Sequence, residues 1–582
     1  MLKSTCGNRL ALCVGSYSPR GRYLTVNQQL PPLPVTSIAE SSPALALPFE
    51  YNAAVAFVDD AFRDSRRDRI AIRTAKRNWT YADLAVGVNR FGNTLRTLSV
   101  DMEQRIALFL YDSPEFACSF FGAIKIGAVP IPTNTSLRPQ DYLYILNDSR
   151  ARVLVVEADL WEQLAPLRAE LPFLRHVITV GRDAVVQTAD DTLDYAALMV
   201  DAQTTLEPAP TTRDDVAFWL YSSGSTGFPK GCVHLQHDMH VSAELYARQV
   251  LGIRPDDVTF SAAKLFFAYG LGNGLYLPLA AGASAIHHPG RVTAESAFQV
   301  ISEQRPTIFF GVPTLYAAML ALPNVESRYD TSSLRLCVSA GESLPAELFT
   351  RWRERFGVEI LDGIGSTEIL HIFISNRPGA AVPGSSGTVV PGYDARIVDE
   401  QGQPVAQGEI GHLLVFGDSI CSQYWNKHER TKSTLIGGWI RTGDQYYQDE
   451  HGNYWYAGRS DDMLKVSGQW VSPAEVEAAL ITHPSVLEAA VVGRDQGDGL
   501  IKPQAFVVLK DGVEPTETLA NELKQHVKTS LLPVKYPRWI AFLPDLPKTA
   551  TGKIQRFRLR EQLARQVESD LEGRTNDGAS QS

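Results

Sequence analysis

One stretch of the sequence combines residue types that can hold polyphosphate. Residues 221–231 read YSSGSTGFPKG. Gly224 and Gly227 let the backbone turn tightly and bring its N–H groups near a ligand, and Lys230 adds a cation. The hydroxyl donors are Ser222, Ser223, Ser225 and Thr226. The segment therefore predicts a phosphate-binding loop, although its spacing differs from the GxxxxGK[ST] of a Walker A motif.

The alternative interpretation of this segment is a flexible Ser/Gly linker, which composition alone would favour. The context argues against it. A strand-like run at residues 216–220 precedes the loop, we expect a helix after it, and Pro229, Lys230 and Gly231 close it. A linker rarely combines these features, so the sequence favours a phosphate loop inside an ordered α/β unit.

The elements around the loop alternate between helices and strands. Residues 82–98 place Leu84, Val88, Phe91 and Leu95 on one helical face. A second helix is expected at residues 115–126, opened by Ser113 and Pro114. Short apolar runs at 105–111 and 152–157 are typical of buried strands. This alternation predicts an α/β fold with mainly parallel sheets.

The segment after Arg459 has a different pattern. Ser472, Pro473 and Glu475 form a helix start, with a capping serine and a proline at the first helical position. Strand-like runs follow at 486–492 and 504–509, and then a helix with Leu519, Leu523 and Val527 on one face. We expect four parts: an extension at 1–45, a large domain at 46–460, a small mobile α+β domain at 461–567 and a disordered tail at 568–582.

Bulk composition excludes several classes of protein. The 582 residues carry a formal charge of −10 and no long tract of one sign, so no nucleic-acid partner is expected. No apolar run approaches the ~18 residues of a membrane span. The six cysteines are widely spaced, which favours a reducing, cytoplasmic location and no disulfides. Residues 1–45 are Ser- and Pro-rich with no acidic residue before Glu40, typical of a disordered extension, an upstream start codon or a transit peptide.

Four further segments follow the loop in order along the chain. They are residues 365–368 (GSTE), 439–444 (WIRTGD), 458–465 (GRSDDMLK) and 547–553 (PKTATGK). Together with the loop they resemble the five motifs of the adenylate-forming superfamily, which includes acyl-CoA synthetases, adenylation domains of peptide synthetases and insect luciferases. The resemblance covers about residues 48–565.

This resemblance implies a two-step reaction with ATP, Mg²⁺ and coenzyme A. A carboxylate attacks the α-phosphate of ATP to give an acyl adenylate and pyrophosphate, and a thiol then displaces AMP. The 222–230 loop would hold the β- and γ-phosphates, Thr367 would contact the α-phosphate, and Glu368 would ligate Mg²⁺. Asp444 would bind the ribose hydroxyls and Arg459 the ribose or phosphate. The residues expected around adenine are Ala340, Gly341, Glu342, Asp362, Gly363 and Ile364.

The resemblance also implies that the small domain moves between the two steps. Lys553 would bridge the attacking carboxylate and the departing oxygen during adenylation. Rotation about a hinge at Asp461 would then remove Lys553 and open a thiol tunnel beside Gly468. In isolation, Glu368, Asp444 and Lys553 could equally be solvated surface charges, as most such residues are. Their place within five ordered motifs favours the functional interpretation.

Three segments narrow the expected acid. Residues 260–274, 306–316 and 362–373 resemble benzoate–CoA ligases, as does the start at residues 51–59. The expected acid pocket consists of Phe267, Ala268, Tyr269, Gly272, Ile364 and His371. It would be compact and mostly apolar, which suits one flat ring. Aromatic residues are more often plain core. The absence of an Asp near Phe267 argues against an α-amino acid, and His371 could bind a ring hydroxyl or amine.

Two other functions stay open at this stage. The chain could load an aryl group onto the phosphopantetheine of a carrier protein, although no attachment motif is visible after residue 565. It could also be a non-catalytic nucleotide sensor. Loss of Lys553, Glu368 or Asp444 would have favoured that function, but all three residues are present. Otherwise the expected partners are small molecules, with a homodimer possible.

Overall fold

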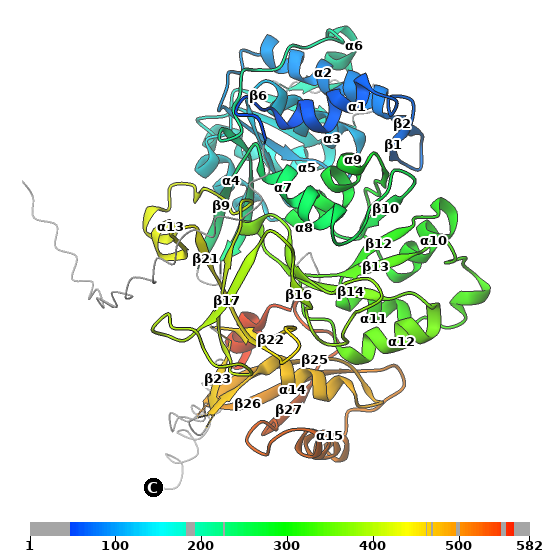
Figure 1. The fold of residues 1–582 in the computed structure, drawn as a ribbon, viewed down its shortest axis with the longest axis vertical. Helices are drawn as coiled ribbons and strands as arrows, with labels where there is room; N and C mark the ends of the chain where they lie inside the picture. The colour runs from blue at the N-terminus through cyan, green and yellow to red at the C-terminus, as the bar shows by residue number, and fades with distance from the viewer. Residues whose placement is uncertain are drawn as a thin grey trace, which may run out of the picture.

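The computed structural model describes residues 47–181, 192–224, 227–460, 462–466, 469–495, 501–548 and 554–563. The predicted extension at 1–45 and tail at 568–582 lie outside these residues. Within the described part of the chain, no helix is long and apolar enough to cross a membrane. The chain forms a large upper body and a small domain at the bottom of Figure 1.

The first part of the large body is a five-stranded parallel sheet, in the order β4-β3-β5-β6-β7 (Figure 1, blue to cyan). Its strands are β3 (Arg105–Phe109), β4 (Val129–Pro132), β5 (Val153–Glu157), β6 (His176–Val180) and β7 (Leu193–Asp194). Helices packed around it include α2 (Tyr81–Thr97), α3 (Pro114–Lys125), α4 (Pro139–Ser149), α5 (Ala158–Leu164) and α6 (Tyr195–Asp201). The two expected helices begin and end within one residue of their predicted bounds.

Local sequence explains where the first two of these helices begin. The Thr80 side chain accepts a hydrogen bond from the Asp83 backbone N–H and Asp83 reciprocates, so α2 starts with a capping box. Ser113 accepts from the Phe116 N–H, with Pro114 at the first helical position of α3. Both helices then bury their apolar faces, including Leu84, in the largest hydrophobic cluster.

A nine-stranded sheet forms the second part of the large body, in the order β16-β15-β14-β13-β12-β10-β11-β1-β2. The strands are β1 (Ile70–Arg73), β2 (Asn78–Thr80), β10 (Val258–Ser261), β11 (Ser284–Ile286), β12 (Ile308–Gly311), β13 (Leu336–Ser339), β14 (Ile360–Gly365), β15 (Ile372–Ser375) and β16 (Thr388–Val389). The six strands from β14 to β1 run parallel, and the outer pairs are antiparallel. Ligands of such sheets bind beyond the carboxyl ends of the parallel strands.

The remaining short helices connect or cover these sheets. They are α1 (Asp60–Arg63), α7 (Asp238–Ser242), α8 (Ala268–Leu271), α9 (Leu277–Ala281), α10 (Ala294–Gln304), α11 (Pro313–Ala321), α12 (Ala346–Phe356) and α13 (His428–Thr434). The π-helical turns are η1 (Val55–Asp59), η3 (Ala243–Arg248) and η4 (Gly272–Tyr276), and the 3₁₀ turns are η2 (Ala165–Glu170), η5 (Val325–Ser327) and η6 (Thr367–Ile369).

The phosphate-loop segment lies in a β-hairpin. Strand β8 (Val216–Gly224) pairs antiparallel with β9 (Gly227–Leu235), and β19 (Gln423–Tyr424) adds a third strand. The prediction that a helix directly follows the loop is wrong, because the chain returns as β9 and α7 starts only at Asp238. Apolar Val233 packs with Trp219 of β8 in a small hydrophobic cluster, which stabilises the returning segment as a strand.

An antiparallel sheet completes the large body. It consists of β17 (Asp394–Val398), β18 (Gly411–Phe416), β20 (Leu435–Ile436), β21 (Trp439–Gln448) and β22 (Tyr454–Arg459). Asp444 on β21 lies directly opposite Arg459 on β22 in the pairing register. Two motifs that are fifteen residues apart in the chain therefore face each other across one hairpin.

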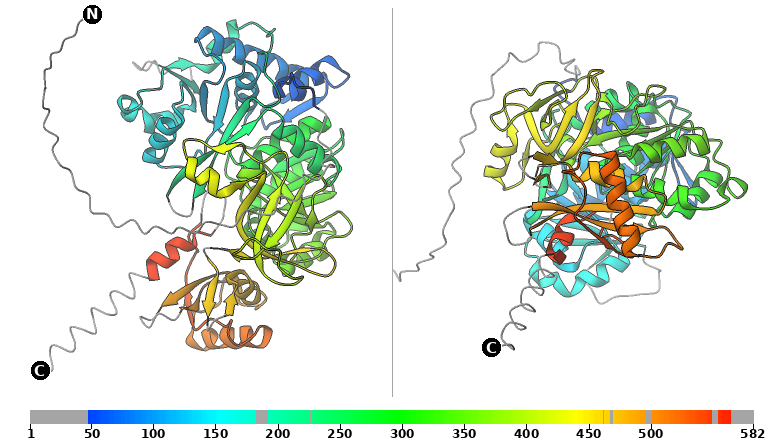
Figure 2. Two further views of the ribbon diagram at one scale, coloured as in Figure 1. Left: turned by 60° about the vertical axis from the view of Figure 1, so that its left-hand side comes forward. Right: turned by 90° about the horizontal axis from the view of Figure 1, so that it is seen from below.

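The small domain is α+β, as predicted, and lies beneath the large body in the left view of Figure 2 and in front of it in the right view, which is seen from below. Its elements are β23 (Leu464–Val466), β24 (Gln469–Val471), α14 (Pro473–Ile481), β25 (Val486–Asp495), β26 (Ile501–Leu509), α15 (Glu517–Ser530) and β27 (Trp539–Phe542). Ser472 caps α14 by accepting from the Glu475 N–H, and α15 buries Leu519, Leu523 and Val527. The boundary at 460/461 and the mobility of this domain stay predictions.

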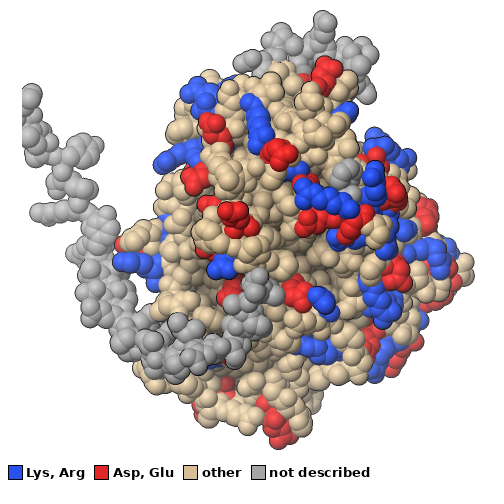
Figure 3. Space-filling model, turned by 45° about the horizontal axis from the view of Figure 1, so that its top comes forward, with Lys and Arg blue, Asp and Glu red and all other residues tan. Residues whose placement is uncertain are grey.

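Surface charge and cysteine burial agree with the composition. On the face shown in Figure 3, Lys and Arg are interspersed with Asp and Glu. Cys118, Cys232, Cys337 and Cys421 are buried free thiols, as expected for small core residues.

Candidate active site

One carboxylate oxygen joins the phosphate hairpin to the GSTE motif. Glu368 Oε1 accepts hydrogen bonds from the Ser222 hydroxyl at 3.1 Å and from the Tyr424 hydroxyl at 2.8 Å. Lys230 Nζ lies 3.9 Å from the same oxygen and 4.6 Å from the centre of the Tyr424 ring. Ser222 and Lys230 are opposite each other in the β8–β9 register. The structure thus brings three predicted site residues together around one oxygen.

Thr367 and Glu368 lie in a short 3₁₀ turn at the carboxyl end of β14. Ser366 caps this turn by accepting a hydrogen bond from the Ile369 N–H at 3.2 Å. Leu370 ends it with φ of +70°, a left-handed conformation that a leucine adopts only where the surroundings hold it. The turn is therefore a fixed feature, and it presents Glu368 toward the hairpin.

The two residues predicted to bind the ribose, Asp444 and Arg459, form a pair. Arg459 Nη1 contacts Asp444 Oδ1 at 3.1 Å and also donates to the Thr442 carbonyl at 3.2 Å. Gly443 between them has φ of +79°, and a Cβ there would lie 2.8 Å from Arg459 Nη2. The positive φ favours glycine at this position, and its missing side chain leaves room for the guanidinium.

The predicted adenine segments lie on two neighbouring parallel strands, one directly after β13 and the other within β14. Ala340, Gly341 and Glu342 come directly after β13, and Gly341 has φ of +92°. Asp362 and Gly363 lie within β14, where Asp362 is buried and its backbone carbonyl accepts from the Asn376 N–H at 2.9 Å. Burial raises the pKa of the Asp362 carboxyl well above its ordinary value.

The predicted acid pocket is assembled around His371. Its ring lies 5.9 Å from that of Tyr269, and its Nε2 is 3.2 Å from Asn273 Oδ1. A Cβ on Gly272 would lie 2.3 Å from His371 Cδ2, so only glycine allows the ring this close. Burial lowers the pKa of His371 to about 3, which keeps the imidazole neutral near pH 7.

The other predicted pocket residues lie on the same elements. Ala268 is buried at the start of α8, and Phe267 precedes it with its ring centre 4.5 Å from that of Phe266. Ile364 and Tyr269 pack against the same hydrophobic cluster. The Tyr269 hydroxyl donates toward the carbonyls of Gly311 and Val338, each at 3.3 Å. These bonds hold the Tyr269 ring in place beside the predicted acid pocket, with its hydroxyl turned toward the backbone.

Comparisons with known proteins show the family of this chain. A family profile described as "AMP-binding enzyme" matches residues 59–425, and one described as "AMP-binding enzyme C-terminal domain" matches 475–553. The chain belongs to the AMP-binding enzyme family. It is 51% identical to a benzoate–CoA ligase of Thauera aromatica, over 91% of this chain and 99% of that protein.

Two further relatives of this AMP-binding enzyme are similar over their whole length. A 4-hydroxybenzoate–CoA/benzoate–CoA ligase of Rhodopseudomonas palustris is 48% identical, covering 89% of this chain and 96% of that protein. The crystal structure of an anthranilate CoA ligase in complex with anthranoyl-AMP superposes with a TM-score of 0.86 at 44% identity, covering 90% and 99% of the two chains. The predicted superfamily and α/β fold are thereby confirmed.

Several predicted site residues of this AMP-binding enzyme lie outside the described part of the chain. These are Ser225, Thr226, Asp461, Gly468 and Lys553. For Ser223, Gly224 and Gly227 the structure describes only the strand to which each belongs. The described residue after Lys553 is Ile554, whose N–H donates to Glu342 Oε1 at 3.0 Å. This bond connects the C-terminal part of the small domain to the predicted adenine motif.

Sequence reasoning missed residues that support the motifs from elsewhere in the chain. Tyr424 binds Glu368, and Tyr246 lies with its ring centre 5.2 Å from that of His371. His234 lies 2.8 Å from the Thr367 carbonyl through Nε2. None of these three residues belongs to a motif. The sequence signal for His234 is its position four residues after Lys230, and Tyr424 and Tyr246 have no comparable signal.

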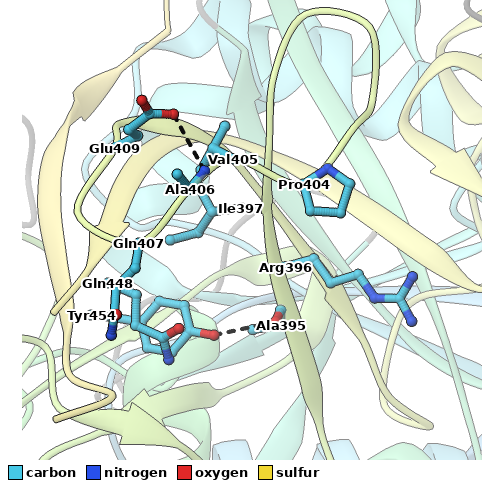
Figure 4. A pocket seen from close by; sticks show the side chains of 10 residues that line it. All are labelled: Ala395, Arg396, Ile397, Pro404, Val405, Ala406, Gln407, Glu409, Gln448 and Tyr454. Atoms are coloured by element: carbon cyan, nitrogen blue, oxygen red, sulfur yellow. Dashed lines mark hydrogen bonds between the residues drawn. The ribbon is translucent and has the colours of Figure 1, made fainter. Parts of the chain in front are cut away.

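A surface hollow of about 310 Å³ lies apart from these residues, between β17, the 404–409 loop and β21–β22 (Figure 4). Its polar groups bond within the chain. The Ala406 N–H donates to Glu409 Oε2 at 3.3 Å, and the Tyr454 hydroxyl donates to the Ala395 carbonyl at 3.2 Å. The hollow therefore offers no convergent set of polar groups for a ligand, unlike the site around Glu368.

Proposed function

We propose that this protein is an AMP-forming acid–thiol ligase that converts benzoate or a small substituted benzoate into its coenzyme A thioester. The observation that carries the proposal is the convergence of Ser222, Lys230 and Tyr424 on Glu368. Glu368 follows strand β14, and Ile364 of that strand packs against the same hydrophobic cluster as Tyr269 of the proposed acid pocket. The relatives named as benzoate– and 4-hydroxybenzoate–CoA ligases support the acid and the thiol.

In the first half-reaction, the carboxylate attacks the α-phosphate of ATP and pyrophosphate leaves. Lys230 and Ser222 bind the β- and γ-phosphates, and the Thr367 hydroxyl binds the α-phosphate. Positioned cations and donors at these places stabilise the extra negative charge of the transition state. Lys553 supplies a further positive charge between the attacking and departing oxygens.

Mg²⁺ fits this site through Glu368. Its carboxylate is oriented by the Ser222 and Tyr424 hydroxyls and lies beside Lys230. Among the described residues, no group of three or more His, Cys, Asp or Glu could hold a metal ion alone. One carboxylate suffices, because Mg²⁺ is commonly bound by one or two carboxylates plus phosphate oxygens and water. When bound, the ion neutralises phosphate charge.

The nucleoside is held by the two strand-end segments and the β21–β22 hairpin. Asp444 accepts hydrogen bonds from the ribose hydroxyls, and Arg459, which already contacts Asp444, reaches the ribose or a phosphate. Ala340, Gly341 and Glu342 and then Asp362, Gly363 and Ile364 surround adenine. The φ of +92° at Gly341 supports this role, since it leaves backbone groups exposed beside a flat ligand.

In the second half-reaction, the coenzyme A thiol attacks the aroyl carbon and AMP leaves. We assign Asp461 as the hinge and Gly468 to the thiol tunnel, with the large domain at 46–460 and the mobile domain at 461–567. The contact between Ile554 and Glu342 supports this assignment, because it brings the end of the small domain against the nucleotide motifs. Closure of this kind excludes water from the adenylate.

The acid pocket takes a single aromatic ring. Two observations support this: Tyr269 and Ile364 pack against the same hydrophobic cluster, and the Tyr269 ring centre lies 5.9 Å from that of His371. Burial keeps His371 neutral, which avoids placing a charge against the ring. Coenzyme A as acceptor is favoured over a carrier protein because the similar proteins are named as coenzyme A ligases. Intact Glu368 and Asp444 disfavour a non-catalytic sensor. We also propose a cytoplasmic location and a homodimer. The buried free thiols support the reducing compartment.

The test is pyrophosphate release over a panel of benzoate, aminobenzoates, hydroxybenzoates, cinnamate and decanoate, with and without coenzyme A. We expect release with small aryl acids, and sustained turnover only when coenzyme A is present. Turnover with a purified carrier protein but not with coenzyme A would support the loading function. No release with any acid would contradict ligase activity.

A further inference from the structure

A buried histidine–aspartate pair connects the phosphate hairpin to the Thr367 turn. His234 is the penultimate residue of β9, and Asp238 is the first residue of α7. Both side chains have no exposed surface. His234 Nδ1 lies 2.7 Å from Asp238 Oδ2, and His234 Nε2 lies 2.8 Å from the Thr367 carbonyl oxygen. A carbonyl oxygen can only accept, so Nε2 carries the hydrogen of that bond.

The imidazole ring is held from several sides. Its face stacks on Phe218 of β8, with ring centres 5.2 Å apart and planes 18° apart. Asp238 Oδ2 also accepts from the Leu235 N–H at 3.1 Å, which fixes the carboxylate that orients Nδ1. The Asp238 carboxylate faces one ring nitrogen and the Thr367 carbonyl faces the other, so the two contacts hold the imidazole in one orientation. In this orientation Nε2 points at the carbonyl of Thr367.

The turn that receives this bond is short and depends on outside partners. The Thr367 carbonyl accepts from His234, the Glu368 carbonyl accepts from the Cys421 N–H at 2.7 Å, and the Ile369 carbonyl accepts from the Ser419 hydroxyl at 2.8 Å. Two distant parts of the chain, His234 and the 419–421 segment, therefore fix three successive carbonyls. Only the His234 bond comes from the strand that also carries Lys230.

From this arrangement we infer that His234, oriented by Asp238, is a positioning residue for adenylation. Strand β9 carries Lys230 beside Glu368 Oε1 and His234 beside the Thr367 carbonyl, four residues apart. One strand thus sets the distance between the phosphate-binding cation and the groups on the turn. His234 acts through Thr367 and Glu368, and the inference rests on their proposed roles.

The test compares His234→Leu, His234→Gln and Asp238→Asn in the full-length enzyme. Leucine fills the space without a donor, whereas the glutamine amide can replace Nε2–H. We expect His234→Leu to slow pyrophosphate release with benzoate at least ~10-fold, the effect of about 1.4 kcal/mol, and to raise the Mg²⁺ concentration for half-maximal rate. Thioester formation from supplied benzoyl-AMP and coenzyme A should change by less than about 3-fold, the scatter of neutral substitutions. His234→Gln should recover most of the first rate.

A matched control is His483→Gln in the small domain. His483 is buried as well, with Nε2 3.2 Å from Glu522, but it lies far from the turn in the sequence and in the fold. Both half-reactions of this variant should stay within about 3-fold of wild type. A merely structural role for His234 would lower thermal stability without changing the Mg²⁺ dependence.

A folded His234→Leu enzyme with wild-type pyrophosphate release and Mg²⁺ dependence would overturn the inference. So would an equal loss in both half-reactions that glutamine does not relieve. If the leucine variant does not fold, Asp238→Asn decides: we expect slower pyrophosphate release with the thioester step retained, and wild-type behaviour would contradict the inference. A wild-type enzyme that releases no pyrophosphate with any aryl acid would instead contradict the proposed function.

Discussion

The nucleotide side and the acid pocket are built in different ways. Around the nucleotide motifs, polar side chains bind one another across distant segments, as Glu368 does with Ser222 and Tyr424. In the acid pocket, side chains are held by packing and by backbone carbonyls, as Tyr269 is by Gly311 and Val338. Phosphate chemistry thus depends on which polar residues are present, whereas acid selection depends on shape. Substitutions should therefore affect rate on one side and preference on the other.

The largest effect is expected from Lys553→Ala. Its positive charge serves only the step in which negative charge develops at phosphorus. Pyrophosphate release should fall by roughly 10²–10³-fold, as on loss of one positioned donor in other active sites. Thioester formation from supplied benzoyl-AMP and coenzyme A should change little. If that second reaction falls as far as the first, the assigned role of Lys553 is wrong.

Glu368→Gln should have the next largest effect. It keeps the size of the side chain but removes the charge that lies beside Lys230 and that, in the proposed mechanism, would hold Mg²⁺. Loss of a charged hydrogen-bonding partner costs about 1.5–3 kcal/mol, so adenylation should slow by roughly 10–100-fold, with partial recovery at high Mg²⁺. Tyr424→Phe is the matched control, because it removes one neutral donor to Glu368, and it should cost less. A phenylalanine variant as slow as Glu368→Gln would show that orientation matters more than charge.

Changes in the acid pocket should shift preference more than rate. Tyr269→Ala removes one wall of the proposed pocket, so kcat/KM for benzoate should fall while bulkier aryl acids gain relative to it. In the wild type, a long chain has to displace packed aromatics at a cost of about 1–3 kcal/mol, so decanoate should be at least ~10-fold poorer than benzoate. An unchanged ranking of acids in Tyr269→Ala would contradict the aryl assignment and leave the family assignment intact.

The smallest effect concerns pH and stability. Burial lowers the pKa of His371 to about 3 in the folded protein, against about 6.5 when exposed. Between these values the unfolded chain binds the extra proton, so stability falls as pH drops from about 6.5 toward 3. At pH 5 this contributes roughly 2 kcal/mol of destabilisation. His371→Gln should reduce the difference in urea midpoint between pH 7.5 and pH 5, and an unchanged difference would contradict the burial argument.

The same contrast explains what the sequence could and could not predict. Ser222, Lys230, Glu368, Asp444 and Arg459 were predicted as site residues because their types and spacing form motifs. The structure brings Ser222 and Lys230 to Glu368 and pairs Asp444 with Arg459. The hairpin that carries the first two was mistaken for a strand–helix unit. A glycine-rich turn precedes strands and helices alike, and local residue types at 227–235 do not reveal the pairing with β8.

The missed residues act through contacts that only the fold creates. Tyr424 reaches Glu368 because β19 joins β9, and His234 reaches Thr367 because β9 passes beside the end of β14. His371 was predicted for the pocket, but the need for glycine at position 272 beside its ring was not predicted. A close approach between a glycine and a ring leaves no periodic pattern in the sequence. Residue types predict the chemistry, and tertiary contacts determine its positioning.

The most direct test of the central claim follows oxygen from the acid. The protein is incubated with benzoate labelled with ¹⁸O in both carboxylate oxygens, together with ATP, Mg²⁺ and coenzyme A, and the products are measured by mass spectrometry. If the carboxylate attacks the α-phosphate, one labelled oxygen stays on phosphorus when the thiol displaces AMP. The account predicts one ¹⁸O in AMP, unlabelled pyrophosphate and one ¹⁸O in benzoyl-CoA. Labelled inorganic phosphate with ADP, or unlabelled AMP, would contradict it.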